Sequence, residues 1–275
     1  MNVIGIDLGA SLAKVIECDK NLNIIHKMCR VRACSALPEK EINILLEKFI
    51  EEFNINMENI ERIILTGVGA PAHRCPEIKE IPAIKIDEFP SIAEGGLCLA
   101  NKHDAIIASV GTGTAFICAQ DNNRRHLGGT GVGGGTLVNL CNRFTKTKSF
   151  EEIVELSSIG NLSNVDLTIG DITTEDIPNL PKDITASNFG KLKKEANDAD
   201  IVLGIINMIF ETIGMMAVFA SRSCTTKDVI LVGTLTKIPY TKTVFERFKS
   251  LCDLNFIIPE NAEYAVAIGA VIEIA

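Results

Sequence analysis

Two short turns that contain glycine carry the residue types best suited to hold a phosphate group. The first covers residues 7–11 and the second covers residues 110–114, and each joins two apolar segments with the composition of strands. Small residues let backbone N–H groups come close to a phosphate, and a hydroxyl side chain adds one more donor. Two such hairpins facing each other could hold a polyphosphate from both sides of a cleft. This pairing favours a hinged phosphotransferase over a Rossmann or P-loop protein.

Two charged residues belong to the first hairpin. Asp7 ends its first strand, where a carboxylate in a phosphoryl-transfer site would hold magnesium directly or through water. An aspartate that only stabilises the turn is the alternative. Lys14 lies on the returning strand among apolar residues and could reach a phosphate as a point charge. A lysine that crosses apolar surface and places its ammonium group in water is the alternative there.

A run of glycines between residues 128 and 135 leads into a predicted helix. Its last part, Gly133 to Gly135, would present exposed N–H groups and the positive end of the helix dipole to an anion or a ribose phosphate. A plain flexible loop is the alternative. The segment from Val232 to Thr234 ends a late strand and precedes a helix, which suits close approach to an adenosine.

A glutamate at a strand-to-helix corner is the candidate catalytic base. Glu88 follows a short apolar strand and precedes Phe89 and Pro90. A glutamate partly shielded at such a corner could accept the hydroxyl proton of an alcohol as phosphorus arrives. The neighbouring Asp87 would point the other way if the strand stays extended. A solvated loop glutamate is the alternative.

The bulk properties narrow the class of partner. The chain has 275 residues, of which 47% are apolar and 23% charged, and its net charge is −8. Such an acidic chain, with a pI near 5.2, argues against nucleic acid or an anionic membrane as the main partner. No secretion signal precedes the first strand, so we expect a cytoplasmic protein. Polar residues interrupt the apolar stretch 201–220, which predicts a core helix and no membrane span.

The cysteines and histidines give no metal-binding pattern. None of the nine cysteines forms a Cys-x-x-Cys pair, and most fall inside apolar runs. We therefore expect buried free thiols instead of disulfides or a zinc site. The four histidines are scattered, so a structural metal is not expected, and magnesium brought by a nucleotide remains open.

Hydrophobic periodicity predicts the same order of elements twice. In the first part we expect strands at 2–7, 12–18, 23–31, 62–67 and 83–86, with helices at 38–53 and 91–101. In the second part we expect strands at 105–110, 114–120, 124–127, 228–233 and 254–258, with helices at 136–144, from 150 onward, and at 185–196, 198–222, 239–252 and 261–274. Residues 160–184 are predicted to be irregular.

Three antiparallel strands followed by a helix and a strand, in duplicate, resemble the ribonuclease-H-like plan. Two such units make the α/β two-lobe fold of actin, sugar kinases and Hsp70 chaperones, with a nucleotide cleft between the lobes. We therefore predict an N-terminal lobe over residues 1–102 and a C-terminal lobe over residues 103–275.

Several motifs together resemble the type II pantothenate kinases, the bacterial relatives of the eukaryotic pantothenate kinases. They are the first hairpin from Gly5 to Lys14, the pair Glu88-Phe89, the second hairpin at 110–114, and Arg124-Arg125 ahead of the glycine run. The segment from Ile184 to Gly190 resembles the family's Leu-Thr-Ala-Ala-Asn-Phe-Gly stretch, which general members of the superfamily lack. The resemblance covers essentially the whole chain.

The resemblance implies an enzyme that uses ATP and Mg²⁺ to phosphorylate pantothenate, the first step of coenzyme A synthesis. It places the catalytic base on Glu88 and a magnesium ligand on Asp7. It also implies a homodimer through the long helix at 198–222, although a helix buried within the monomer explains the same pattern. The implied nucleotide contacts are Asp7, Leu8, Gly9, Ala10, Ser11, Leu12, Ala13, Lys14, Thr112, Gly134, Gly135, Thr136, Leu137, Val138, Phe150 and Thr234.

Two positions depart from the family pattern. Ala10 and Ser11 replace the usual glycine and threonine of the first turn. The pantothenate-binding arginine of the family lies seven residues before the triple glycine, a position that here is His126, with Arg125 one residue earlier. A one-residue offset turns a strand side chain to the opposite face. Either a bulge restores Arg125 to the pocket, or Arg124 and His126 line it.

Three functions stay open from the sequence. The first is a pantothenate kinase, with Arg125 and His126 as candidate substrate-binding residues. The second is a kinase of the same fold acting on another small alcohol or an amino sugar. The third is a nucleotide-dependent activator ATPase, although the scattered cysteines do not suggest the metal cluster that such activators hold at a dimer interface.

Overall fold

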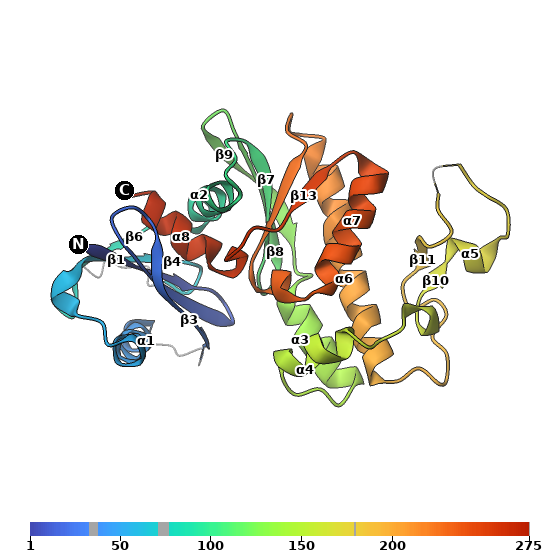
Figure 1. Ribbon diagram of the computed structural model, residues 1–275, viewed down its shortest axis with the longest axis horizontal. Coiled ribbons are helices and arrows are strands. Elements are labelled where there is room, and N and C mark those ends of the chain that lie inside the picture. Colours follow the sequence, from blue (N-terminus) through green and yellow to red (C-terminus); the bar gives the residue numbers. More distant parts are fainter. Residues whose placement is uncertain (33–37, 71–76, 179, 275) are drawn as a thin grey trace.

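The computed structural model describes residues 1–32, 38–70, 77–178 and 180–274, which form two lobes with one main β-sheet each (Figure 1). The first sheet has the strand order β3-β2-β1-β4-β6-β5 and the second has the order β13-β12-β7-β8-β9. The α/β two-lobe fold predicted from the sequence is therefore confirmed.

The two sheets share one topology. In the first lobe, β1 (Asn2–Leu8) pairs antiparallel with β2 (Leu12–Cys18), and β2 pairs antiparallel with β3 (Ile24–Val31). On its other side β1 pairs in parallel with β4 (Ile60–Thr66), and β4 pairs in parallel with β6 (Ile81–Lys85). The two-residue strand β5 is Glu77–Ile78. In the second lobe, β7 (Ala105–Val110), β8 (Thr114–Gln120), β9 (Asn123–Thr130), β12 (Asp228–Val232) and β13 (Asn255–Ile257) repeat that pattern. The two sheets thus have the same strand order and the same parallel and antiparallel pairings, which is the duplication that the order of elements predicted.

Amphipathic helices cover the outer faces of both sheets. In the first lobe α1 (Pro38–Phe53) buries Ile42, Leu46 and Phe49, one face at helical spacing, against β1 and β4. In the second lobe α6 (Asp198–Ser221) and α7 (Tyr240–Cys252) pack on the outer face of the sheet, and α3 (Gly134–Phe144) and α4 (Phe150–Ser157) pack beside α6 (Figure 1). Each sheet thus contributes to a separate hydrophobic core.

Two helices cross between the lobes, and each packs on the sheet of the other half of the chain. α2 (Glu88–Ala100) follows the first sheet in sequence but packs on β7, β8 and β12 of the second. α8 (Ala265–Ile272), at the end of the chain, packs on β1, β2 and β4 of the first sheet. By packing, α2 therefore belongs to the second lobe and α8 to the first, so the lobes do not divide at a single residue.

The crossing of α2 and α8 requires glycine on both helices. A Cβ atom on Gly95 would lie 1.8 Å from the carbonyl oxygen of Ala265, and a Cβ on Gly269 would lie 1.8 Å from that of Ser91. Backbone atoms cannot yield to such a contact as a flexible side chain can. The two glycines therefore let the helix backbones touch at the junction of the lobes.

The segment before α6 departs from the sequence-based expectation. Residues 185–196 were predicted to be a helix, but they form β11 (Thr185–Ser187) and a series of turns. β11 pairs with β10 (Leu167–Thr168), and α5 (Ile169–Ile172) follows β10. Phe189, in the turns after β11, has φ 57°, a left-handed conformation that is incompatible with a continuing right-handed helix.

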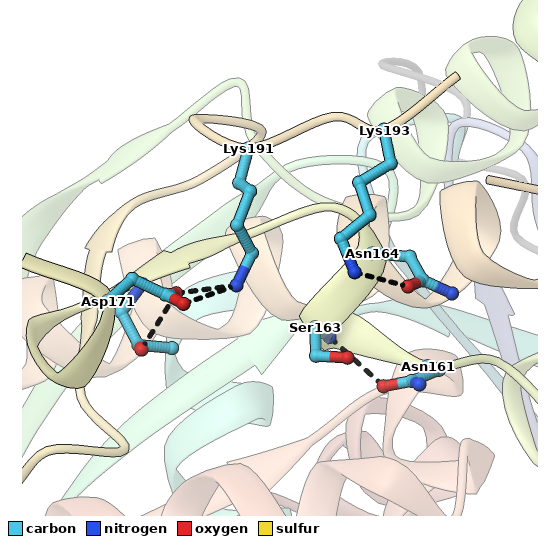
Figure 2. A network of polar contacts seen from close by, with 7 residues as sticks. Asn161, Ser163, Asn164, Asp171, Lys191 and Lys193 are labelled. Carbon is cyan, nitrogen blue, oxygen red and sulfur yellow. Dashed lines mark hydrogen bonds and ion pairs between the residues drawn. The ribbon is translucent and has the colours of Figure 1, made fainter. Parts of the chain in front are cut away.

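Polar contacts fasten this segment to itself (Figure 2). Lys191 Nζ lies 2.6 Å from a carboxylate oxygen of Asp171, and that carboxylate also accepts the backbone N–H of Thr168. These partners lower the pKa of Asp171 to about 2. Lys193 Nζ donates to Asn164 across 3.1 Å. Side-chain contacts therefore hold parts of this segment to one another.

The apolar helix α6 is long enough by composition to cross a membrane, yet 61% of its most apolar window is buried inside the protein. Its buried residues include Ile206, Ile209 and Phe210 in the core of the second lobe. The prediction of a core helix at this position is confirmed.

The cysteine expectation is wrong at one pair. Cys118 on β8 and Cys224 after α6 are paired as a disulfide, because the end of α6 lies against β8 at this level of the sheet. Among the described cysteines, the other five are free thiols, but only Cys18 and Cys141 are buried as expected; Cys29 and Cys252 are half-buried, and Cys98 is exposed. Cys34 and Cys75 lie outside the described residues.

Candidate active site

The two glycine hairpins meet tip to tip between the lobes. Ser11, in the turn between β1 and β2, lies on the first lobe, and Thr112, in the turn between β7 and β8, lies on the second. Their hydroxyl oxygens Oγ and Oγ1 are 2.9 Å apart. The corresponding turns of the duplicated sheets thus converge on one place, as the spacing of the motifs predicted, and could hold one polyphosphate from both sides.

A buried ion pair lies at the base of the first hairpin. Asp7 and Lys14 are partners in the register of β1 and β2, and Lys14 Nζ lies 3.2 Å from Asp7 Oδ2. Both side chains are less than a tenth exposed. The alternative, in which the Lys14 ammonium group lies in bulk water, is excluded because that group is buried and paired with the Asp7 carboxylate. Together they place one negative and one positive group at the base of the turn between β1 and β2.

Glu88 begins α2 beside this pair. Burial raises the pKa of its carboxyl group, and the negative charge of Asp7 raises it further, whereas Lys14 and the backbone N–H of Val68 oppose the shift. Val68 donates its amide proton to the Glu88 carboxylate. A glutamate with a raised pKa, half buried next to the candidate phosphate hairpin, has the properties of a general base. The alternative of a fully solvated loop glutamate is excluded.

The turn after β4 completes the base of this site. Gly67 has φ +92°, and a Cβ atom there would lie 2.6 Å from Asp7 Oδ1 and 2.5 Å from the Leu8 carbonyl oxygen. Only glycine adopts that φ without strain and leaves room for the Asp7 carboxylate. The turn therefore brings the Val68 amide, which binds Glu88, directly behind the first hairpin.

The glycine run supports the second hairpin through its backbone. The N–H groups of Gly134 and Gly135, at the start of α3, donate to the carbonyl oxygens of Gly111 and Thr112 at 2.8 and 2.9 Å. The Gly133 N–H faces Thr136 Oγ1 at 3.3 Å. In this conformation these amides fix the 111–113 turn, so their part in the site is to set the position of Thr112.

The other residues that were expected to contact the nucleotide differ in burial. Leu8, Ala13 and Leu137 have side chains buried in the two lobe cores, so only their backbone could touch a ligand. Thr234 begins the short 3₁₀ helix η3 (Thr234–Lys237) after Gly233, whose φ of +102° lets the chain pass against Val110. The remaining expected contacts are half-buried or exposed: Gly9, Ala10, Leu12, Val138 and Phe150.

The two candidate substrate residues point to opposite faces of the second sheet. Leu127 forms a bulge in β9, but the side chains of the residues before it still point alternately to the two faces of the sheet. His126 stacks on Phe89, the residue after Glu88, with ring centroids 4.1 Å apart and planes at 12°. Arg125 instead donates to the carbonyl oxygen of Ser223, beyond α6, at 2.8 Å. Arg125 therefore lies on the face of the sheet away from α2, and its part in substrate binding stays a prediction.

Arg124 shares the α2 face with His126, and its Nε lies 2.5 Å from Glu94 Oε1 on α2. Of the two arrangements that the sequence left open, the structure has Arg124 and His126 on the side of Glu88. The stacked rings of Phe89 and His126 lie next to the candidate base, whereas Arg124 pairs with Glu94, further along α2.

No motif in the sequence indicated the buried ion pair behind the first hairpin. Arg32 follows β3 and donates from Nη1 to the carbonyl oxygen of Gly9 at 2.5 Å. Glu41 on α1 accepts from Nε and Nη2 of the same guanidinium group. An arginine at a strand end carries no recognisable motif, so only the folded arrangement identifies it.

The carboxylates at this site suit a magnesium ion that arrives bound to a nucleotide better than one that is coordinated by protein side chains alone. Asp7 supplies one carboxylate at the hairpin, with Glu88 close enough for the two charges to interact. Within the part of the chain that the structure describes, no group of three or more His, Cys, Asp or Glu side chains could hold a metal by itself. Mg²⁺ keeps several waters and uses one or two carboxylates plus phosphate oxygens, which this set fits.

Comparisons with solved structures agree with the two-lobe fold. An activator of 2-hydroxyisocaproyl-CoA dehydratase from Clostridium difficile, solved with bound ADPNP, superimposes with a TM-score of 0.68 at 16% identity, covering 99% of this chain and 94% of that one. A ROK family glucokinase from Streptomyces griseus, in complex with glucose and AMPPNP, gives a TM-score of 0.62 at 12% identity and 98% coverage of both chains. At these identities the likeness shows the fold alone.

Sequence comparisons are more specific. The type II pantothenate kinase of Staphylococcus aureus strain bovine RF122 is 27% identical over 278 aligned residues, which cover 97% of this chain and 97% of that protein. The enzyme of strain USA300 is 26% identical with the same coverage. The model of the Fumble family matches residues 100–270, more than half of the chain. The protein belongs to the Fumble family and is homologous to the type II pantothenate kinases.

Proposed function

We propose that this protein is an ATP-dependent kinase that phosphorylates the primary hydroxyl of pantothenate, the first step of coenzyme A biosynthesis. The observation that carries the proposal is the meeting of the Ser11 and Thr112 hairpins, with Glu88 beside the Asp7–Lys14 pair. The pantothenate kinase names of the full-length relatives support the choice of acceptor.

In the proposed reaction the two hairpins hold the triphosphate with backbone amides and the hydroxyls of Ser11 and Thr112. Lys14 offsets negative charge on the phosphates, and Glu88 takes the proton of the acceptor hydroxyl as the phosphoryl group arrives. Bound Mg²⁺, held at Asp7 directly or through water, would neutralise charge on the phosphate oxygens. The chain's own contribution is therefore positioning and proton acceptance.

The test is a coupled assay of ADP release with MgATP and a panel of acceptors, together with Glu88→Ala. Pantothenate-dependent ADP release in the wild type, and its loss in Glu88→Ala with nucleotide binding retained, would support the proposal. Wild-type-like turnover in Glu88→Ala would refute the role of Glu88. ADP release without any acceptor would favour a nucleotide-dependent ATPase instead.

The Phe89–His126 stack supports a second candidate, a kinase for another small alcohol or an amino sugar. His126 occupies the position where the resembled family has an arginine for the pantothenate carboxylate, and a neutral imidazole is a poorer bidentate partner for that group. The same acceptor panel decides between the candidates, since an alcohol without a carboxylate should then exceed pantothenate in kcat/KM.

A homodimer through α6 is part of the proposal. Met215 and Phe219 are exposed on its second half, at 40% and 56%, although the rest of the helix is a core element. Size-exclusion chromatography with light scattering should give a dimer for the wild type and a monomer for Phe219→Glu. A monomeric wild type would leave α6 as an internal helix only.

A further inference from the structure

Arg32 and Glu41 form a buried two-bond ion pair between the end of β3 and α1. Arg32 Nε donates to Glu41 Oε1 at 3.0 Å, and Nη2 donates to Oε2 at 2.6 Å. The two side chains are only 7% and 8% exposed. A planar guanidinium held by both oxygens of a carboxylate has a fixed orientation, which a lysine ammonium cannot reproduce.

The same arginine holds the first phosphate hairpin at two points. Its side-chain Nη1 donates to the carbonyl oxygen of Gly9 at 2.5 Å, and its backbone N–H donates to the carbonyl oxygen of Ser11 at 3.0 Å. These two carbonyls flank the tip of the turn. Arg32 therefore restrains the residues whose amides and hydroxyl face the second hairpin.

On its other side the guanidinium group lies against the turn that contacts Glu88. A Cβ atom on Gly69 would lie 1.9 Å from Arg32 Nη1, so the arginine fills the space that any other residue would need there. The Gly69 N–H donates to the Leu8 carbonyl oxygen at 2.8 Å, and the preceding amide, Val68, donates to the Glu88 carboxylate. One side chain thus touches both the phosphate hairpin and the turn that orients the candidate base.

We propose that Arg32, oriented by Glu41, is a positioning residue that holds the Gly9–Ser11 turn and the Gly67–Gly69 turn in one fixed arrangement. Its catalytic consequence rests on the proposed kinase function, because it sets the distance between the nucleotide phosphates and Glu88. Misplacement by about 1 Å can lower a rate by about 100-fold, so such a residue matters without touching the substrate.

The experiment compares Arg32→Lys and Glu41→Gln with a matched control, Arg30, which lies on β3 two residues before Arg32. Arg30 also pairs with a glutamate, Glu52 on α1, at 2.5 Å, but both side chains are over two-fifths exposed. Arg30→Lys therefore changes the same residue type, two residues from Arg32, without altering a buried contact. Thermal unfolding identifies any variant that fails to fold, and Glu41→Gln tests the pair while retaining Arg32.

Two readouts are measured on each variant: amide hydrogen exchange of peptides that cover the two turns, and steady-state kinetics. In Arg32→Lys and Glu41→Gln we expect exchange in both turns to become about tenfold faster while the second sheet is unchanged. We expect kcat/KM for MgATP to fall between about 10-fold and 100-fold, with the acceptor KM within about twofold of wild type. Arg30→Lys should match the wild type in both readouts.

Unchanged exchange in the two turns of Arg32→Lys would overturn the proposal, whatever the activity. So would faster exchange together with wild-type kcat and KM values in an active enzyme, since the pair would then serve folding alone. A wild type that phosphorylates no alcohol would instead end the proposed function, and hydrogen exchange would still decide the role of Arg32.

Discussion

Ser11 Oγ and Thr112 Oγ1 are 2.9 Å apart, although 101 residues separate them in the chain. The contact joins corresponding turns of two sheets with the same topology, so the duplicated plan itself creates the meeting point. The lobes are therefore close together at the two hairpins.

Removing either hydroxyl should weaken nucleotide binding. A hydrogen bond to a charged group contributes about 1.5–3 kcal/mol, so Ser11→Ala and Thr112→Val should each raise the KM for MgATP by roughly tenfold or more. Valine keeps the methyl group of Thr112 that faces Gly135. Thr112→Ser, which keeps the hydroxyl, is the control and should stay near the wild type. Equal KM values for the valine and serine variants would contradict this prediction.

The pH dependence of kcat should report Glu88. Its pKa is raised above the usual value of 4.5, so activity should fall as the pH drops through a point higher than 4.5. Asp7 contributes to this raised pKa through its negative charge, whereas Lys14 opposes it. In Asp7→Asn the acidic limb of the residual activity should therefore move to lower pH. A limb that moves to higher pH would contradict the electrostatic assignment.

Breaking the buried Asp7–Lys14 pair should destabilise the fold. Asp7→Ala leaves Lys14 buried without this partner, and such a change typically costs about 3–5 kcal/mol. Glu47, which is 56% exposed and pairs with Lys79, provides the control. Glu47→Ala should change the free energy of unfolding by no more than about 1 kcal/mol. Urea unfolding followed by circular dichroism measures both; similar values would show that burial of the pair does not matter.

The helix crossing should not tolerate a methyl group. Gly95→Ala places a Cβ against the Ala265 backbone, so we expect a loss of several kcal/mol in stability or insoluble protein. At Gly131 a Cβ meets nothing within 4 Å, and Gly131→Ala should unfold within a few degrees of the wild type. Differential scanning calorimetry compares the variants. A Gly95→Ala protein as stable as Gly131→Ala would mean that α2 and α8 can separate easily.

Much of the local structure followed from the sequence. The strands at 12–18, 105–110 and 114–120 have the predicted bounds, because alternating or continuous apolar runs between turn residues have few other solutions. The helix predicted at 185–196 was wrong, since a short segment with mixed propensity takes its shape from its neighbours. There Asn188 donates to Glu211 on α6, a contact that no local pattern encodes.

The sequence alone determined the glycine turns, their strand context and the duplicated order of elements, because glycine and apolar periodicity act over a few residues. The tertiary structure decided which side chains meet. It put His126 on Phe89 and turned Arg125 away, since strand alternation and the Leu127 bulge set the facing of each residue. It also placed Arg32 between two turns, a contact that depends on how β3, α1 and the turn after β4 pack together.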